Sequence, residues 1–162
     1  MITGILSSDE LESLSKKIVK LSKADWCEVS LGSSQSAHLR YAANTVSTSG
    51  STTNTSISIT AAFGKRAGSV STNDLSDSGL SAAMARAEEI AKLAPENEEL
   101  MPPLDSKQTY ARSAQYDDSS ADSSYTASER ARIAEHAIKE ARARKFIAAG
   151  FFANYGWQYG IS

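Results

Sequence analysis

The sequence has few of the residues on which most active sites depend. Its 162 residues include one cysteine, Cys27, and two histidines, His38 and His136. A single cysteine cannot form an internal disulfide bond, which fits a reducing compartment. Zinc hydrolysis needs two or three closely spaced ligands and a general base, and neither histidine has a second one a helical turn away. We therefore expect no catalytic, metal-binding or cofactor-binding residue in this chain.

The sequence also lacks a strong net charge and a long apolar run. Its 17 basic and 19 acidic residues give a net charge of -2, which argues against a surface for nucleic acid. No apolar stretch is long enough to span a bilayer. The first six residues lack the basic and apolar regions of a signal peptide. We expect a cytoplasmic protein that binds neither nucleic acid nor membrane.

The few reactive side chains all have simple structural interpretations. Cys27 falls on the core-facing side of a predicted strand, where burial makes a thiol inert. His38 falls on the polar face of a strand, where we expect it to be solvated. His136 and Glu140 form an ordinary i,i+4 helix pair. The acidic residues within 117–122 lack the glycine and final glutamate of a calcium loop, so we expect a solvated loop.

Two helices are predicted in the first hundred residues. The first covers residues 6–23, with leucine and isoleucine at helical spacing and a capping box of Ser7 and Glu10. The second ends near residue 93, before Pro95. Its start can be capped by any of three residues, Asp74, Ser76 and Ser78. Its buried side is predicted to contain Leu80, Ala83, Met84, Ala87, Ile90 and Ala91.

A third helix is predicted after a polar linker, residues 95–125. It covers residues 126–144 and begins with another capping box, Thr126 and Glu129. Its packing side is predicted to be Ala127, Ala131, Ala134, Ala137, Ile138 and Ala141. A strand at residues 146–153, a turn at 154–156 and the start of a returning strand at 157–162 follow it.

Between the first two helices, the side chains alternate with a period of two, as in strands with one buried face. We predict strands at residues 25–31, 37–41, 46–48, 55–63 and 69–72. Turns are predicted at residues 32–35 and 64–68, because glycine and serine supply the required backbone freedom. Tight turns between successive strands imply antiparallel pairing. The fold class is therefore α/β of the α+β type, a mainly antiparallel sheet with packed helices.

The predicted elements suggest one domain in three parts. Residues 1–94 form a helix–sheet–helix core, residues 95–125 a linker, and residues 126–162 a helix with the start of a second strand pair. A half-made hairpin exposes an unpaired strand edge, which natural proteins usually avoid. We therefore expect this chain to be a fragment of a longer one, or its edge to be completed by a partner.

Four passages of the sequence resemble a known protein family. The first is ADWCEVSL, residues 24–31, where a helix end leads into a strand. The second is FGKRAGSVSTNDLS, residues 63–76, which reads as a turn, a strand and a helix start. Together with IAKLAP at residues 90–95 and AAGFF at residues 148–152, they are similar to the TldD/PmbA family, once called modulators of DNA gyrase.

The resemblance implies the N-terminal domain of a two-part protein, with a curved, mainly antiparallel sheet and packed helices. The β-rich C-terminal domain is absent from this sequence. In the TldD branch a HExxxH motif and a later cysteine bind the metal, and two subunits form a chamber for peptides. The PmbA branch lacks these ligands and acts as the partner. No such motif occurs here, so the resemblance assigns no site residue to this chain and leaves zinc to the full-length protein.

The resemblance thus implies an N-terminal scaffold or substrate-channel domain of a metalloprotease, or of its metal-free partner subunit. Such a protein would work as a homo- or heterodimer on unfolded peptides, in peptide maturation or proteolysis. The alternative is a non-enzymatic α/β interaction module that pairs through an open sheet edge. An extended peptide can add a strand through backbone hydrogen bonds with little demand on its sequence. The Ser/Thr-rich stretch at residues 51–60 suits such tolerance.

Overall fold

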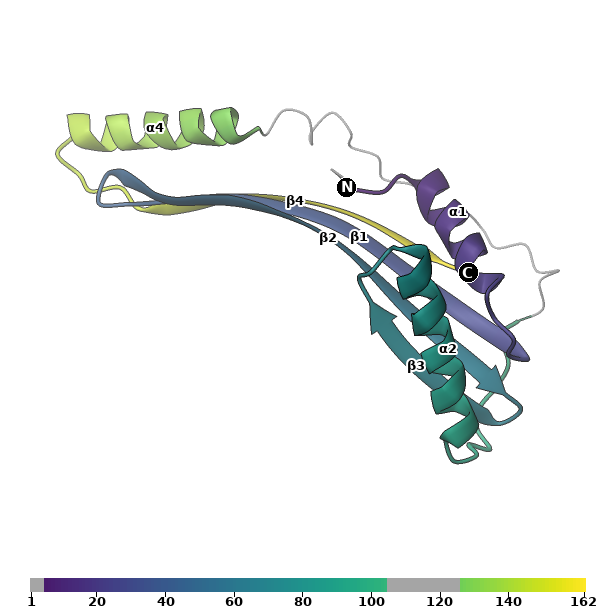
Figure 1. The fold of residues 1–162 in the computed structure, drawn as a ribbon. Coiled ribbons are helices and arrows are strands. Elements are labelled where there is room, and N and C mark those ends of the chain that lie inside the picture. The colour runs from purple at the N-terminus through teal and green to yellow at the C-terminus, as the bar shows by residue number, and fades with distance from the viewer. Residues whose placement is uncertain (1–4, 105–125) are drawn as a thin grey trace. The chain divides into compact units, whose positions relative to one another are not determined.

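The computed structural model describes residues 5–104 and 126–162 (Figure 1). The acidic residues within 117–122 lie outside the described residues. The elements in chain order are α1 (Ser8–Val19), β1 (Trp26–Ala42), β2 (Thr45–Phe63), β3 (Arg66–Thr72), α2 (Asp77–Leu93), α4 (Ala127–Ala143) and β4 (Gly150–Ile161). The strands form one antiparallel sheet in the order β3-β2-β1-β4. This arrangement confirms the predicted α+β class.

The chain folds into two compact units, and β1, β2 and β4 contribute residues to both. Of the described residues, the first unit contains 5–33, 54–104 and 157–162. The second contains 34–53 and 126–156. No helix in the described part of the chain is long and apolar enough to cross a membrane.

The core of the first unit lies between one face of the sheet and helices α1 and α2 (Figure 1). It is formed mainly by Leu11, Ile18, Val29, Leu31, Ile57, Ile59, Leu80, Met84 and Ala87. The strand residues in this set occupy alternate positions, as a half-buried sheet requires. Met84 is 1% exposed and fills the core, as predicted.

The predicted turn at residues 32–35 is wrong, because β1 runs without interruption from Trp26 to Ala42. Ser33 is buried, and its hydroxyl accepts a hydrogen bond from the amide of Leu6 at 3.0 Å. The same face continues with buried Ala37 and Leu39. Apolar residues therefore stay in phase on both sides of the Gly-Ser segment, which indicates one long strand. The predicted strands at residues 46–48 and 55–63 are likewise parts of the single strand β2.

The predicted turn at residues 154–156 is also wrong, because β4 is one strand from Gly150 to Ile161. The strand begins at Gly150 and not at the predicted Phe146. Within the second unit, the amide oxygen of Asn154 accepts a hydrogen bond from Arg130 of α4 at 2.9 Å. Asn154 is therefore held in the strand by a side-chain partner, although Asn-Tyr-Gly has the composition of a turn.

The helix starts agree with the predicted caps, and the details differ at two points, the end of α1 and the partner of Glu129. Ser7 and Glu10 form the complete capping box of α1, but the helix ends at Val19, before the predicted Lys23. Ser76 is the cap of α2. Thr126 caps α4 through the amide of Glu129 at 3.2 Å. The Glu129 carboxylate binds Arg132.

The packing side of α4 is rotated from the predicted alanine face. Ala134 and Ile138 are buried as expected, whereas Ala127 and Ala131 are exposed. Arg130 is buried in their place. Arg130 faces the strand because its guanidinium donates a hydrogen bond to the side chain of Asn154 on β4. On α2, similarly, Glu88 is buried and Ile90 is exposed, contrary to the prediction for Ile90.

Candidate functional site

The residues that carry the family resemblance connect elements of the fold. The Asp25 carboxylate accepts a hydrogen bond at 2.8 Å from the amide of Gly64, in the turn between β2 and β3. Gly64 has a positive φ of 55°, a conformation that suits glycine. The Lys65 ammonium donates 3.0 Å hydrogen bonds to the carbonyls of Glu98 and Leu100, in the segment after α2. Both passages therefore stabilise the same end of the first unit.

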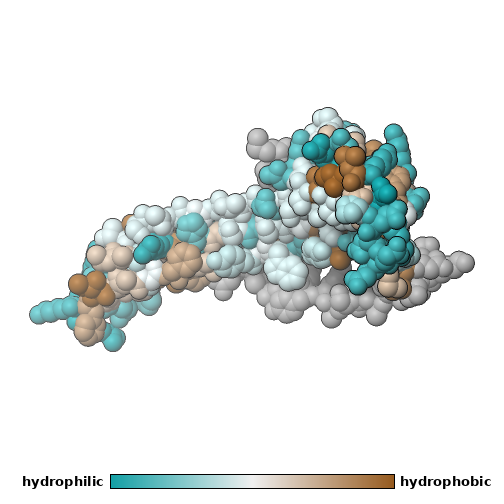
Figure 2. Space-filling view, turned by 90° about the horizontal axis from the view of Figure 1, so that it is seen from below, coloured by the Kyte–Doolittle hydropathy of each residue, from teal (hydrophilic) through white to brown (hydrophobic). Residues whose placement is uncertain are grey.

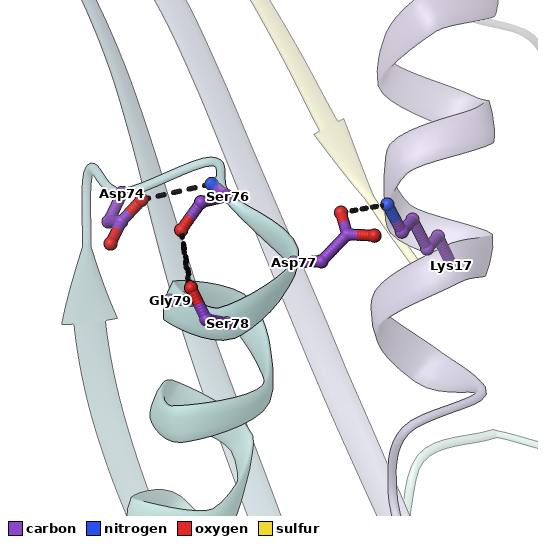
Figure 3. A network of polar contacts seen from close by, with 6 residues as sticks. All are labelled: Lys17, Asp74, Ser76, Asp77, Ser78 and Gly79. Atoms are coloured by element: carbon purple, nitrogen blue, oxygen red, sulfur yellow. Dashed lines mark hydrogen bonds and ion pairs between the residues drawn. The ribbon is translucent and has the colours of Figure 1, made fainter.

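The STNDLS passage builds the start of α2 (Figure 3). The Asp74 carboxylate accepts a hydrogen bond from the amide of Ser76 at 2.9 Å, and Ser76 then caps the helix through the amide of Gly79 at 3.0 Å. The hydrogen bond from Ser76 holds the pKa of Asp74 below its ordinary value of 3.8. Next to this turn, Lys17 of α1 pairs with Asp77 of α2. These contacts define a helix start.

The two histidines and the cysteine lie in different surroundings in the described part of the chain. Cys27 is a free thiol that packs against the core, as predicted. His38 lies on the predicted strand face, but it stacks on Phe151 with ring centroids 5.8 Å apart. His136 is exposed, and Glu140 pairs with Arg144 at 3.6 Å. No group of three or more His, Cys, Asp or Glu residues in the described ranges could hold a metal ion.

A small cavity lies between the end of α1 and the side of α2. Its volume is about 240 Å³, and its lining includes Leu21, Lys23, Met84 and Glu88. Glu88 is only 6% exposed and accepts a hydrogen bond at 2.5 Å from the amide of Lys23. The cavity is smaller than usual ligand sites, and its one buried charge binds the backbone after α1. We interpret this contact as structural.

The most unusual surface of the first unit is the outward face of β4. Trp157, Tyr159 and Ile161 are 75%, 54% and 60% exposed. They occupy alternate positions, so their side chains lie on the same face of the strand. Strand β4 contains no charged residue between Gly150 and Ile161. We call these three residues the β4 row.

The residues of the C-terminal segment that alternate with the β4 row face α1. The amide of Gln158 donates to the hydroxyl of Ser8 at 2.7 Å, and the Ser162 hydroxyl contacts that of Ser15 at 2.7 Å. An added Cβ at Gly160 would lie 3.9 Å from Leu11 of the same helix. One face of β4 is therefore fixed on α1, and the β4 row remains on the opposite face.

The hydrogen bonds of β4 show which backbone groups remain available. Val29 of β1 and Ser162 exchange two bonds, N–H to O, at 2.7 and 2.9 Å. In an antiparallel ladder every second residue of a strand bonds the same neighbour. Gln158 and Gly160 therefore bond toward β1, while the N–H and C=O groups of the β4 row point away from it. Because β4 is the end strand of the sheet in the described residues, these groups have no strand partner there.

The face beside the β4 row is rich in hydroxyl groups. Gly32 on β1 leaves space there, since an added Cβ would lie 3.2 Å from Ser56 Oγ and 3.9 Å from the Tyr159 ring. Farther along the same face of β2, the hydroxyls of Thr60 and Ser69 are 2.8 Å apart. Figure 2 shows large pale areas of near-neutral hydropathy over the strands, the range of Ser, Thr, Tyr and Trp. The hydroxyl-bearing residues of this face are polar and uncharged, and Glu28 of β1 adds one exposed carboxylate to it.

The expected peptide edge on β2 is paired with β3 over only part of its length. Residues 51–60 were expected to suit strand addition, but Ile57–Phe63 already pairs with β3 on one side, and β1 flanks β2 on the other. The C-terminal part of that stretch is therefore central in the sheet. The sequence pattern predicted a strand at residues 157–162, but it did not identify the β4 row. The alternation of large apolar residues from Phe151 to Ile161 is the sequence signal that could have identified the row.

Comparison with known proteins connects this fold to one family. The sequence model of the family described as PmbA/TldA metallopeptidase domain 1 matches residues 27–91. No curated protein matches the sequence. Among solved structures, TldE from Thermococcus kodakarensis has a TM-score of 0.63 at 19% identity, over 94% of this chain and 34% of its own.

Two further structures are described as candidate modulators of DNA gyrase. The protein from Bacteroides thetaiotaomicron has a TM-score of 0.68 at 14% identity, over 96% of this chain and 41% of its own. The protein from Thermotoga maritima has a TM-score of 0.60 at 14% identity, over 94% of this chain and 35% of its own. The three structures share the fold, and this chain spans about 34% to 41% of their length.

Proposed function

We propose that this chain, which belongs to the PmbA/TldD family, is the N-terminal scaffold of a metallopeptidase or of a metal-free partner subunit. Its role is to hold an unfolded peptide for cleavage elsewhere in the full-length protein or in the partner. The described residues do not fit a zinc site, so a metal would have to be bound by other residues.

The observation that supports the proposal is the uncharged outer edge of β4, the end strand of the described sheet. Natural proteins commonly protect an exposed edge with charged residues or proline, because an edge pairs readily with any extended chain. The β4 segment from Gly150 to Ile161 has neither. Backbone pairing at this edge would hold a peptide with little regard to its sequence, as the handling of unfolded substrates requires.

The second candidate is an interaction module without a peptide substrate. The same edge supports it, since a strand of another folded subunit can pair with β4 in the same way. The two functions differ in what occupies the edge: a transient unfolded peptide, or a permanent protein strand. A module of the second kind would be dimeric, or bound to a second subunit, and would not bind free peptides.

The test compares this chain with the full-length gene product. We expect the chain alone to bind unfolded peptides but to bind no zinc and cleave nothing. We expect the full-length protein, alone or with its partner subunit, to contain zinc and cleave the same peptides. Sedimentation measurements on the chain give its oligomeric state. A dimeric chain that binds no peptide would favour the interaction module and contradict the scaffold.

Proline substitutions can show that β4 is the edge used. Tyr159→Pro removes an N–H that points away from β1, so the β1–β4 ladder should remain. Tyr159→Ala is the matched control, because it removes the ring but keeps the N–H. If backbone pairing holds the peptide, the proline variant should bind more weakly than the alanine variant. Equal binding by both would argue against pairing at β4.

A further inference from the structure

We propose that one end of the second unit is a docking surface for an acidic segment of another protein. This end consists of the β1–β2 turn and the connection from α4 to β4, and we call it the basic tip, residues 40–46 and 139–149. It is separate from the β4 edge of the proposed function. Three features of the tip carry the inference: its charge, its exposed apolar side chains and its fixed backbone.

The charge of the basic tip is opposite to that of the chain as a whole. The tip contains five basic residues and one acidic residue, a formal charge of +4, whereas the chain has a net charge of -2. The basic residues are Arg40, Lys139, Arg142, Arg144 and Lys145, and all are exposed. The acidic residue, Glu140, pairs with Arg144 at 3.6 Å, and the other four cations form no ion pair within the described ranges. Such an excess attracts an acidic partner.

Large apolar side chains lie among these charges. Phe146 and Ile147 are 65% and 79% exposed, and Val46 of β2 is 45% exposed. At this end of the second unit, Figure 2 shows hydrophobic atoms next to hydrophilic ones. Neighbouring exposed apolar residues with a polar rim are typical of interaction surfaces. The occupant should therefore present apolar side chains together with carboxylates.

The side chain of Asn44 fixes the backbone of the tip. It donates a hydrogen bond to the Phe146 carbonyl at 3.0 Å and accepts one from the Ala148 amide at 2.7 Å. The Asn44 amide donates to the Ala148 carbonyl at 3.2 Å, and the Arg142 guanidinium donates to the Asn44 carbonyl at 2.7 Å. Asn44 has a φ of 60°, which asparagine tolerates better than most residues. The α4–β4 connection thus displays Phe146 and Ile147 from a bonded backbone.

This fixed backbone favours a protein segment over a lipid surface. Groups that are already held in place lose less conformational entropy when a protein partner binds them. An anionic membrane also attracts basic residues next to apolar ones, but a fluid surface requires no fixed geometry. The Asn44 contacts would then contribute nothing. The occupant that fits is a segment with Asp or Glu on both sides of one or two large apolar side chains.

The probe is a labelled peptide in which glutamates flank a pair of leucines, and fluorescence anisotropy gives its Kd. We expect binding by this chain and by the full-length protein, weakening as salt increases. Arg144→Glu with Lys145→Glu should raise the Kd about tenfold. Lys20→Glu with Lys23→Glu, two exposed lysines after α1, makes the same change of charge in the first unit and should leave the Kd nearly unchanged. Equal Kd values for the two double variants would overturn the docking surface.

Two further variants test the apolar side chains and the backbone. Phe146→Ser with Ile147→Ser should weaken peptide binding by about tenfold or more, because both side chains are buried on docking. Asn44→Gly keeps the turn, since glycine accepts a positive φ, but removes the two side-chain hydrogen bonds. It should also bind the peptide more weakly. Circular dichroism checks that each variant is folded. Unchanged binding by the serine variant would place the peptide elsewhere, for example at β4.

Vesicles and the full-length protein supply the opposing outcomes. Vesicles of phosphatidylcholine and phosphatidylserine should not bind the chain in a way that depends on Asn44. Binding to these vesicles without binding to the peptide would overturn the proposal in favour of a lipid surface. Peptide binding by this chain but not by the full-length protein would mean that another part of the same protein covers the tip, and this too would overturn it. Neither result would bear on the β4 edge.

Discussion

Gly68 on β3 lies directly against Ala91 of α2. A Cβ added at Gly68 would come within 3.0 Å of the Ala91 amide nitrogen and of the Ala87 carbonyl oxygen, closer than real Cβ atoms approach their neighbours. The helix backbone therefore rests on the strand backbone at this point. This contact explains the second glycine of the FGKRAG passage physically: it allows α2 to pack closely on the sheet.

Gly68→Ala should destabilise the first unit strongly. Overpacking of this kind costs about 1–3 kcal/mol, and a clash with helix backbone belongs at the upper end. Gly160→Ala is the matched control, since its Cβ would meet only Leu11 at 3.9 Å. Urea unfolding followed by circular dichroism measures both. Equal stability of the two variants would contradict the close packing of α2 on β3.

Ser76→Ala should weaken the start of α2. The Ser76 hydroxyl accepts the hydrogen bond of the Gly79 amide, and loss of such a cap typically costs about 1 kcal/mol. Ser76→Asn should restore most of the stability, because asparagine is an equally good cap. The measurement is the midpoint of thermal unfolding of the three proteins. If the asparagine variant is as unstable as the alanine variant, the capping interpretation is wrong.

Asp74 should make stability depend on pH in the acid range. Its pKa is lowered by the hydrogen bond from the Ser76 amide, so the folded state stabilises the ionised carboxylate relative to the protonated form. This contribution is fully present above the ordinary pKa of 3.8 and is lost as the pH falls through the lowered pKa of the folded state. Asp74→Asn should therefore flatten the curve of unfolding free energy against pH below about pH 4. An unchanged curve would exclude this role.

Lys65→Met should loosen the segment that follows α2. Its ammonium group donates hydrogen bonds to the carbonyls of Glu98 and Leu100, and the Lys65 carbonyl accepts from the Asn97 amide. The first two bonds are exposed, so the global loss should be no more than about 1 kcal/mol. Amide exchange at Leu100 should accelerate, whereas Lys20→Met, an exposed lysine on another element, should leave it unchanged. Similar amide exchange at Leu100 in both variants would mean that Lys65 does not hold this segment.

Local signals in the sequence predicted the helices well and the strand ends poorly. Ser7 with Glu10, Ser76 and Thr126 each cap the helix that the sequence predicts there, because capping depends on residues close in the chain. The turns predicted at residues 32–35 and 154–156 do not exist. Glycine and serine allow a turn but do not require one, and tertiary contacts decided both cases. Ser33 binds the chain before α1, and Asn154 binds Arg130.

The β4 row could not be predicted for the same reason, because tertiary contacts determine which face of β4 is exposed. The alternation of apolar residues from Phe151 to Ile161 is visible in the sequence, but it does not say which face is buried. Packing of Gln158, Gly160 and Ser162 on α1 settles this, and those partners are about 150 residues away in the chain. The family resemblance was correct without revealing the site, because its motifs build the fold and lie mostly in other elements.

The most direct test of the peptide-holding edge is amide hydrogen exchange of the 162-residue chain with and without an extended peptide. Alone, the amides of Trp157, Tyr159 and Ile161 should exchange quickly, while those of Gln158 and Gly160 are protected by β1. With the peptide, the first three should become protected and the other two should not change. Peptide binding that leaves Trp157, Tyr159 and Ile161 unprotected would contradict the account.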